Sequence, residues 1–513
     1  MNVGSRGLNP IAACLVLAAS GCQETEPTSD ASVDASIDGT TTTSDGSTDA
    51  FLAPDAFDPG PLPPRRFVTD ELGRALILHG TQDGSGKDDP ERSPALTEDD
   101  VARMADDWGL DFFRYLVFWD ALEPMPGVID EAYLDRIEAR LDWFAAHGIH
   151  VMLDMHQDVY ARRFCCDGAP EWAIRDDGEP FTLQSTWSLN YFQPAVMRAF
   201  DNFWAYEEHR DLQDHYAAAW EALASRFRDH PAVLGYDLMN EPWPGSAFDS
   251  RELRPDGAGP SASTAEFDRT LFASFYERVI ARVRAVDTEH WIFVEPRNTA
   301  AGGAMQFVPE LDDPRAGPSR IVWAPHLYSV RYEASMSYDR GEDLTVSRWA
   351  RSREEETRLH DWPILMGEFG MDPSYPGASE YLDDVLAMAD ETRISWAYWT
   401  FNGSWGFWDP VAGAERPHVA QIVRAYPQRV AGTPTAWSWD RATRTFSLTF
   451  EAAAGVTGET EIFVPAARFY PAGFDVSSSD ADGTWSYTFD DAHQRVSIVA
   501  SDDTTHTITI TPR

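Results

Sequence analysis

The chain has 513 residues, of which 43% are hydrophobic and 12% aromatic, enough to bury one large core with a smaller one beside it. Its formal net charge of −43 excludes nucleic acid as a partner, because binding a polyanion needs clustered cations. The basic residues are almost all arginine, and Lys87 is the single lysine. We expect a soluble, extracellular protein of two domains that acts as a monomer.

The N-terminus predicts export. Residues 1–22 carry Arg6, an apolar run at 11–19 and the sequence Ala19-Ser20-Gly21-Cys22, which is typical of a bacterial secretion signal that ends at a lipidated cysteine. An ordinary cleaved signal peptide is the alternative, since Ala19 stands where leucine is commoner. The apolar run is too short to span a membrane. We expect Cys22 to carry lipid and to anchor the secreted protein in the cell envelope.

The next segment predicts a disordered acidic linker over residues 23–66. From 23 to 64 the chain consists mainly of Ser, Thr, Asp, Ala and Pro, with nine acidic residues and no Lys or Arg. Such a composition cannot bury enough apolar surface to fold. We expect a flexible stalk that holds the folded part away from a membrane surface.

Residues 67–429 alternate short apolar runs with helical segments, the pattern of a parallel sheet built from strands and crossover helices. The fold class is therefore α/β. Eight such units predict a (β/α)8 TIM barrel with its active site at the carboxyl ends of the strands. The expected strands lie at 75–81, 112–118, 149–155, 233–239, 291–295, 321–326, 364–368 and 394–400.

One predicted helix, over 264–286, shows a regular apolar stripe. Ser263 and Glu266 form a capping box at its start. The side chains expected on its buried face are four residues apart: Phe267, Leu271, Phe275, Val279 and Val283.

Residues 430–513 change to alternating polar and apolar positions, as in 445–450, 485–489 and 507–510. This pattern predicts a small C-terminal β-sandwich. The sandwich could bind glycan or a membrane surface. Packing against the barrel is the favoured interpretation, because a fold alone does not specify function.

Two glutamates directly follow buried strands of the predicted barrel. Strand four ends in Asn240-Glu241-Pro242, and strand seven ends in Glu368. Hydrolysis of a glycosidic bond with retention needs two carboxyl groups about 5 Å apart, one to protonate the leaving oxygen and one to attack the anomeric carbon. Strands four and seven face each other across the barrel mouth, which favours this role over two unrelated salt-bridge partners. We predict that Glu241 and Glu368 form this catalytic pair.

The motifs Asn240-Glu241-Pro242 and Gly367-Glu368-Phe369-Gly370 resemble those of glycoside hydrolase family 5, whose members keep the acid/base on strand four and the nucleophile on strand seven. The resemblance implies a retaining glycosidase with Glu241 as acid/base and Glu368 as nucleophile. It also implies further substrate-binding or site residues at strand ends: Arg114, His156, Asn240, His326, Tyr328 and Trp399.

Each implied residue has a physical role. Arg114 and Tyr328 would hold Glu368 ionised, since a cation and a hydroxyl donor favour the carboxylate. Asn240 would hydrogen-bond the sugar 2-hydroxyl. Glu241 must keep a raised pKa to act as an acid near neutrality. The two histidines would position substrate hydroxyls or tune the carboxyl groups, and Trp399 would form the floor of the sugar site.

Longer runs are similar to the endoglycoceramidases, which cut the bond between an oligosaccharide and ceramide in glycosphingolipids. They are 154–160 (DMHQDVY), 166–170 (CDGAP) and 238–244 (LMNEPWP). This resemblance implies that Lys87 and Asp158 contact the sugar next to the cleaved bond and that Trp187 forms a further wall. The long loops at 158–190, 242–263 and 329–350 would shape a sugar cleft and an apolar groove for two alkyl chains.

Some alternatives stay open at this stage. The chain could be a family 5 endo-glucanase or mannanase that acts on polysaccharide, or a non-catalytic glycan-binding surface lipoprotein. The adjacent Cys165 and Cys166 could form a vicinal disulfide or remain two buried thiols. The sequence shows no nucleotide-binding loop or metal-ligand cluster, so we expect neither a cofactor nor a metal.

Overall fold

The computed structural model describes residues 63–253, 262–329, 331, 335–409, 411–500 and 504–513. The predicted signal sequence, Cys22 and the linker up to residue 62 lie outside the described residues. The last four residues of the predicted linker are described, and among them Arg66 Nη1 donates a hydrogen bond to the Asp361 carbonyl at 2.9 Å. No helix in the described ranges has the length and apolar character needed to cross a membrane.

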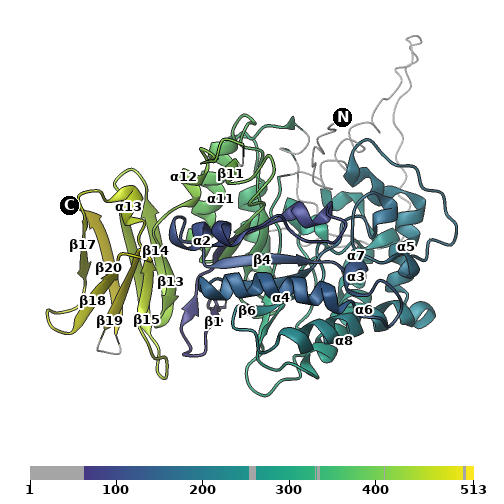
Figure 1. Ribbon diagram of the computed structural model, residues 1–513, viewed down its shortest axis with the longest axis horizontal. Coiled ribbons are helices and arrows are strands. Elements are labelled where there is room, and N and C mark those ends of the chain that lie inside the picture. The colour runs from purple at the N-terminus through teal and green to yellow at the C-terminus, as the bar shows by residue number, and fades with distance from the viewer. Residues whose placement is uncertain (1–62, 254–261, 330, 332–334, 410, 501–503) are drawn as a thin grey trace, which may run out of the picture.

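Eight parallel strands form a barrel, which confirms the predicted (β/α)8 fold (Figure 1). The strands follow one another in the order β8-β7-β6-β5-β4-β3-β10-β9. The ring closes between β8 and β9, where the Trp323 N–H donates to the Pro363 carbonyl at 2.8 Å. The last seven strands match their predicted ranges to within three residues at either end. The strands are β3 (His79–Gln82), β4 (Phe112–Val117), β5 (His150–Met155), β6 (Val233–Asp237), β7 (Trp291–Val294), β8 (Ile321–Trp323), β9 (Leu365–Phe369) and β10 (Ser395–Tyr398).

The first predicted strand, 75–81, is wrong as one continuous element. Its beginning is β2 (Ala75–Leu76), which pairs with β1 (Val68–Thr69) and with β13 (Tyr426–Val430) of the C-terminal sheet. The chain joins the barrel only from β3 onward, where it pairs with β4 and β10. The apolar run is continuous because both parts are buried, although they belong to different sheets.

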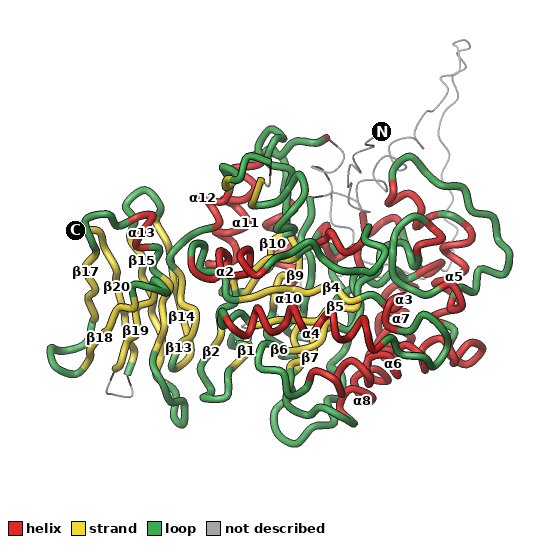
Figure 2. Tube along the Cα trace, viewed as in Figure 1, coloured by secondary structure: helices red, strands yellow, loops and turns green. Residues whose placement is uncertain are grey.

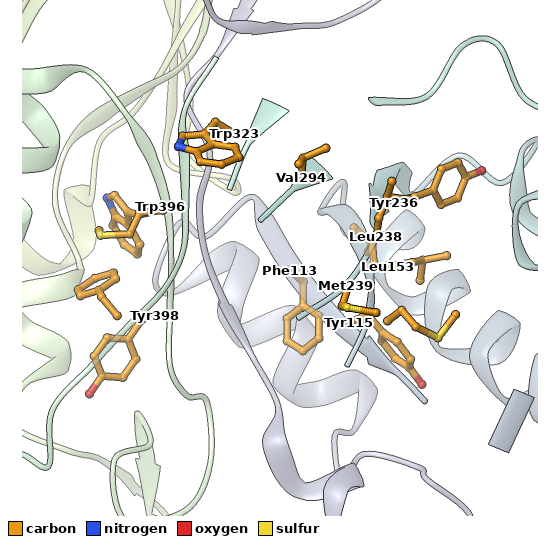
Figure 3. Close-up of a cluster of buried hydrophobic side chains, with 14 of the residues drawn as sticks. Phe113, Tyr115, Leu153, Tyr236, Leu238, Met239, Val294, Trp323, Trp396 and Tyr398 are labelled. Carbon is orange, nitrogen blue, oxygen red and sulfur yellow. The ribbon is translucent and has the colours of Figure 1, made fainter. Parts of the chain in front are cut away.

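Helices surround the strands on the outside of the ring (Figure 2). Figure 3 shows buried side chains between these layers, including Phe113, Tyr115, Leu153, Trp323 and Trp396. The described helices of the barrel are α2 (Glu98–Asp106), α3 (Trp119–Leu122), α4 (Glu131–Ala146), α5 (Pro194–Trp204), α6 (Tyr206–Phe227), α7 (Ala262–Phe267), α8 (Ala273–Arg284), α10 (Thr345–Glu356), α11 (Ala378–Thr392) and α12 (Val419–Ile422).

The helix predicted over 264–286 contains a turn of π-helix, η7 (Asp268–Phe272), between α7 and α8. This wider turn adds a residue to the apolar spacing, so Phe272 is buried and Leu271 is 44% exposed. The expected burial of Leu271 is therefore wrong. The capping box is also wrong, because α7 begins at Ala262 and Ser263 lies inside the helix.

The lumen of the barrel has an apolar layer below a charged layer. Successive side chains of a strand point to opposite faces, so residues two apart point the same way. On β4, Phe112 belongs to the apolar cluster inside the ring and Arg114 lies one step above it. In the same way, Met152 lies in the apolar layer below Asp154, and Phe293 lies in the apolar layer below Glu295. Both members of each pair are buried.

The C-terminal region is the predicted β-sandwich. One sheet has the order β1-β2-β13-β16-β19-β18 and the other β14-β15-β20-β17. Trp437 Nε1 donates to Asp390 of α11 at 3.0 Å, so the sandwich packs on the barrel. The remaining elements are β11 (Trp408–Asp409), β12 (Ala414–Glu415), β14 (Gly432–Asp440), β15 (Thr445–Ala452), β16 (Thr460–Phe463), α13 (Ala466–Phe469), β17 (Phe474–Ser478), β18 (Trp485–Asp490), β19 (Arg495–Ala500) and β20 (Thr505–Pro512).

Candidate active site

The two predicted glutamates lie together at the carboxyl ends of β6 and β9. One carboxylate oxygen of Glu241, one of Glu368 and a ring nitrogen of His326 lie within 4.8 Å of one another. Glu241 is 5% exposed and Glu368 is 6% exposed. The spacing suits a pair that flanks one anomeric carbon, for which about 5 Å is needed.

Glu368 receives two strong hydrogen bonds. Arg114 Nη1 donates to Glu368 Oε1 at 2.6 Å, and the Tyr328 hydroxyl donates to Oε2 at 2.8 Å. Burial and the neighbouring Glu368 carboxylate raise the pKa of Tyr328 well above its ordinary value, so the phenol keeps its proton. These donors hold the carboxylate in one orientation at the barrel mouth.

Glu241 has the environment of a proton donor. Burial raises its pKa to about 7, although the adjacent His326 acts in the opposite direction. His326 Nδ1 lies 2.9 Å from Glu241 Oε1 and 3.6 Å from Glu368 Oε2. Burial opposes the charge on His326, but Glu295 and Glu368 raise its pKa well above the ordinary value. Near neutral pH, Glu241 can therefore hold a proton beside a positively charged imidazole.

Arg114 is the centre of the charged layer and is fully buried. Although burial opposes its charge, the surrounding carboxylates raise its pKa. Asn240 accepts from Arg114 through Oδ1 and donates to the Gln157 carbonyl through Nδ2 at 2.9 Å. Besides Glu368, the nitrogens of Arg114 contact Gln82 Oε1 at 2.8 Å, Asp154 Oδ1 at 3.0 Å, Asp237 Oδ2 at 3.1 Å, Asn240 Oδ1 at 2.8 Å and Glu295 Oε1 at 2.8 Å.

His156 follows β5 and joins this layer to Trp399. Its Nδ1 lies 2.7 Å from Asp154 Oδ2, and its ring stacks on Trp399 with centroids 6.0 Å apart and planes 8° from parallel. Burial opposes its charge, but Asp154 raises the pKa of His156 to about 9. The structure thus places both predicted residues on one side of the site.

Lys87, in the 3-10 turn Gly84–Lys87, reaches the same side from the loop after β3. Its ammonium contacts the Asp158 carboxylate, lies 3.8 Å from Asp167 Oδ2 and lies 5.3 Å from the Trp399 ring centroid. Burial acts to raise the pKa of both acids. Lys87 nevertheless lowers that of Asp158 to about 2, whereas that of Asp167 rises to about 6. The structure brings the predicted Lys87 and Asp158 pair together.

Trp187 lies in the 3-10 segment Trp187–Phe192, apart from the hydrogen-bonded network. Its ring is 6.4 Å from Tyr191, and its carbonyl accepts from Asn190 Nδ2 at 2.7 Å. The same Asn190 nitrogen lies 3.5 Å from the sulfur of Cys165, which forms a disulfide with Cys166. Of the two options open from sequence, the structure therefore has the vicinal disulfide, next to Asp167.

The structure adds polar residues that the sequence prediction missed: Gln82, Asp154, Asp167, Asp237 and Glu295. Glu295 directly follows the apolar strand β7, the same signal that identified Glu241 and Glu368. Asp154 and Asp237 lie at the ends of β5 and β6, where a charge among apolar neighbours is itself a signal.

Three groups of the described residues place possible metal-ligand atoms within 4.8 Å of one another: His156, Asp158 and Asp167; Glu241, His326 and Glu368; and Asp154, Asp237 and Glu295. A positively charged side chain contacts each of the three groups. Lys87 pairs with the first, and Arg114 contacts the second and third. These cations occupy the electrostatic role that a metal ion would have.

Two family models match the chain. One, described as Cellulase (glycosyl hydrolase family 5), matches residues 80–404. The other, described as the glycoside hydrolase family 5 C-terminal domain, matches residues 424–510. Together the two matches cover the barrel and the sandwich.

Two proteins that are similar to this chain are endoglycoceramidases. The chain is 33% identical over 423 residues to Endoglycoceramidase I of Rhodococcus hoagii (strain 103S), covering 80% of each chain. It is 28% identical over 470 residues to an endoglycoceramidase of Cyanea nozakii, covering 82% of this chain and 88% of that one.

Solved structures of Endo-glycoceramidase II from Rhodococcus sp. are also similar to the structure of this chain. The complex with ganglioside GM3 has a TM-score of 0.80 and 36% identity, covering 88% of this chain and all of that one. The lactosyl-enzyme intermediate has a TM-score of 0.77 and 37% identity, covering 87% of this chain and all of that one.

Proposed function

The chain belongs to glycoside hydrolase family 5, within its endoglycoceramidase group, and we propose that it hydrolyses the β-glycosidic bond between oligosaccharide and ceramide in glycosphingolipids. The observation that carries this proposal is the buried pair of Glu241 and Glu368, whose carboxylates face each other within 4.8 Å at the barrel mouth. Lys87 and Asp158 form an ion pair near enough for Asp158 to raise the pKa of Glu241, and the ion pair offers a donor and acceptors to sugar hydroxyls.

The geometry supports a retaining double displacement. In the first step, a Glu368 oxygen attacks the anomeric carbon, and protonated Glu241 gives its proton to the glycosidic oxygen as the bond to ceramide breaks. Ceramide leaves as an alcohol, and the oligosaccharide remains as an ester on Glu368. In the second step, Glu241 accepts a proton from water, which attacks the anomeric carbon and releases Glu368 as a carboxylate.

The pKa of Glu241 is coupled to these steps. The negative charge of Glu368 is one cause of the raised value. Once Glu368 is esterified that charge is gone, so Glu241 becomes more acidic and suits its second role as a base. Because the first step needs protonated Glu241, activity is expected to fall above pH of about 7.

Exposed apolar side chains support a lipid substrate. Leu183, in the loop after β5, is 65% exposed. Met336 and Leu344, in the loop after β8, are 49% and 66% exposed. Both loops leave the end of the barrel that carries the glutamates. Apolar side chains exposed at this end are available to contact alkyl chains.

The test is incubation of the purified protein with ganglioside GM3, with lactosylceramide and with a soluble cellulose or mannan. We expect detergent-dependent release of oligosaccharide from the lipids, seen by thin-layer chromatography, and none with the Glu368→Gln variant. A 2-fluoro lactoside should label Glu368 covalently in the wild type. Release from polysaccharide alone would favour the glucanase or mannanase alternative, and binding without turnover would favour the glycan-binding one.

We also propose that the enzyme is secreted and held at the bacterial cell envelope as a monomer through a lipid on Cys22. Support comes from Arg6, the apolar run at 11–19 and the acidic segment that follows. Expression in a bacterial host followed by fractionation tests the anchor. The wild type should stay with membranes and Cys22→Ser should be soluble, whereas membrane association of both would contradict the anchor. Size-exclusion chromatography of Cys22→Ser tests the monomer.

A further inference from the structure

We propose that Glu295 is a positioning residue for the acid/base Glu241, an inference that rests on the hydrolase function proposed above. Glu295 directly follows β7, points into the lumen above the apolar layer and is 1% exposed. Its backbone carbonyl accepts from the Tyr276 hydroxyl of α8 at 2.7 Å, which ties it to the outer helix layer.

One carboxylate touches three parts of the site. Glu295 Oε2 accepts from the backbone N–H of Glu241 at 2.8 Å. Its Oε1 accepts from Arg114 Nη2 at 2.8 Å and lies 3.2 Å from His326 Nε2. Glu295 therefore contacts the backbone of the acid/base, the imidazole beside that acid and the arginine that donates to the nucleophile.

The backbone contact acts on an unusual conformation. Glu241 has φ of 39°, in the left-handed region that side chains other than glycine rarely adopt. Its N–H is held by Glu295, and its carbonyl accepts from Gln157 Nε2 at 3.1 Å. Backbone groups on both sides of the Glu241 Cα are thus held by buried side chains. Relaxation to an ordinary backbone conformation would turn the Glu241 carboxyl group away from the sugar.

The charge of Glu295 acts through His326. Burial alone would neutralise both groups, but His326 and Arg114 hold the pKa of Glu295 below its ordinary value. Glu295 in turn is the largest favourable influence on the positive charge of His326. The charged imidazole then lowers the pKa of Glu241. Glu295 thereby keeps Glu241 acidic enough to release its proton as the glycosidic bond breaks.

The direct test is Glu295→Gln, which keeps the side-chain shape and removes its charge. His326 should then hold its proton less firmly and lower the pKa of Glu241 less, so the alkaline pKa of the kcat/KM profile should rise by about one pH unit. The value of kcat on ganglioside GM3 should fall by about 100-fold. The fall on 2,4-dinitrophenyl β-lactoside should be much smaller, because that leaving group departs without a proton.

Glu356→Gln is the matched control. Glu356 of α10 is 0% exposed and likewise accepts from a backbone N–H, that of Gln306, at 2.7 Å and from an arginine, Arg353, at 2.6 Å. It lies behind β8, where it accepts from Trp323 Nε1 at 2.8 Å. The control should lose thermal stability while keeping the wild-type alkaline limb and the wild-type ratio of rates on the two substrates.

A merely structural role for Glu295 would appear as a Glu295→Gln variant that behaves like the control, and this result would overturn the inference. If Glu295→Gln does not fold, Glu295→Asp serves, since it keeps the charge but shortens the reach. It should keep the wild-type alkaline limb and lose rate on ganglioside GM3, and wild-type rates on both substrates would overturn the inference. A wild-type protein that cleaves neither substrate contradicts the proposed function instead.

Discussion

The lower and upper layers of the barrel lumen come from the same strands and are both buried, but the lower layer is apolar and the upper layer is charged. Phe112 and Phe293 lie in the lower layer among apolar side chains, whereas Arg114 and Glu295 lie two residues further along the same strands. The lower layer stabilises the fold because it removes apolar surface from water. The upper layer buries charges, which costs free energy unless each charge is paired.

The comparison of the two layers shows that the charged layer lies next to the two glutamates. Arg114 contacts four carboxylates, a costly arrangement that a purely structural barrel would not need. Two of the upper-layer residues, Arg114 and Glu295, are one or two contacts from the two glutamates. Variants in the upper layer should therefore lose activity, whereas a conservative change in the lower layer should leave activity nearly intact.

The largest expected effect is that of Glu368→Gln. The amide cannot attack the anomeric carbon, so kcat on ganglioside GM3 should fall on the order of 10⁴-fold or more. Steady-state kinetics checks the fall, and circular dichroism checks that the variant is folded. Residual activity within 100-fold of the wild type would mean that another group is the nucleophile.

Arg114→Leu places an apolar side chain in the charged layer and leaves several buried carboxylates without their cation. Unfolding free energy should drop by about 3–5 kcal/mol, and activity should be lost with it. Urea denaturation measures the first quantity. Phe112→Leu in the lower layer is the matched control, expected to cost about 1 kcal/mol with activity within a few-fold of wild type. Equal stability of Arg114→Leu and wild type would remove the contrast between the layers.

Glu241→Gln should stabilise the protein at alkaline pH. The folded protein keeps a proton on Glu241 up to pH of about 7, whereas the unfolded chain loses it near the ordinary value of 4.5. Between these values the folded state binds more protons, so its stability falls as pH rises. Relative to wild type, the variant should gain nothing at pH 4 and at most about 3 kcal/mol at pH 8. Denaturation at both pH values checks this, and an equal gain at both would contradict it.

Lys87→Met should have the smallest effect. It removes an ammonium that contacts Asp158 and lies 3.8 Å from Asp167, so sugar binding should weaken while the two glutamates stay in place. We expect KM for ganglioside GM3 to rise about 10-fold, the loss of one charge-assisted hydrogen bond, with kcat within a few-fold of wild type. Lys87→Arg is the conservative control. A large fall in kcat with unchanged KM would place Lys87 in the chemical step instead.

Most of the barrel could be predicted because its signals are local. Apolar runs of strand length and the acids that follow them directly identified seven strands and both glutamates. The wrong predictions have non-local causes. Ala75–Leu76 belongs to β2 because a partner strand more than 300 residues later takes it into the C-terminal sheet. Leu271 is exposed because a π-helical turn shifts the apolar spacing of its helix.

The sequence by itself determined the order of the elements, the strand ends that carry Glu241 and Glu368, and the change from barrel to sandwich, because hydrophobic periodicity and charge after an apolar run depend only on neighbouring residues. Only the tertiary structure decided which side chains share the lumen. Asp154, Asp237 and Glu295 come from three different strands, and they meet around Arg114 because closing the ring brings alternate residues of those strands to one level.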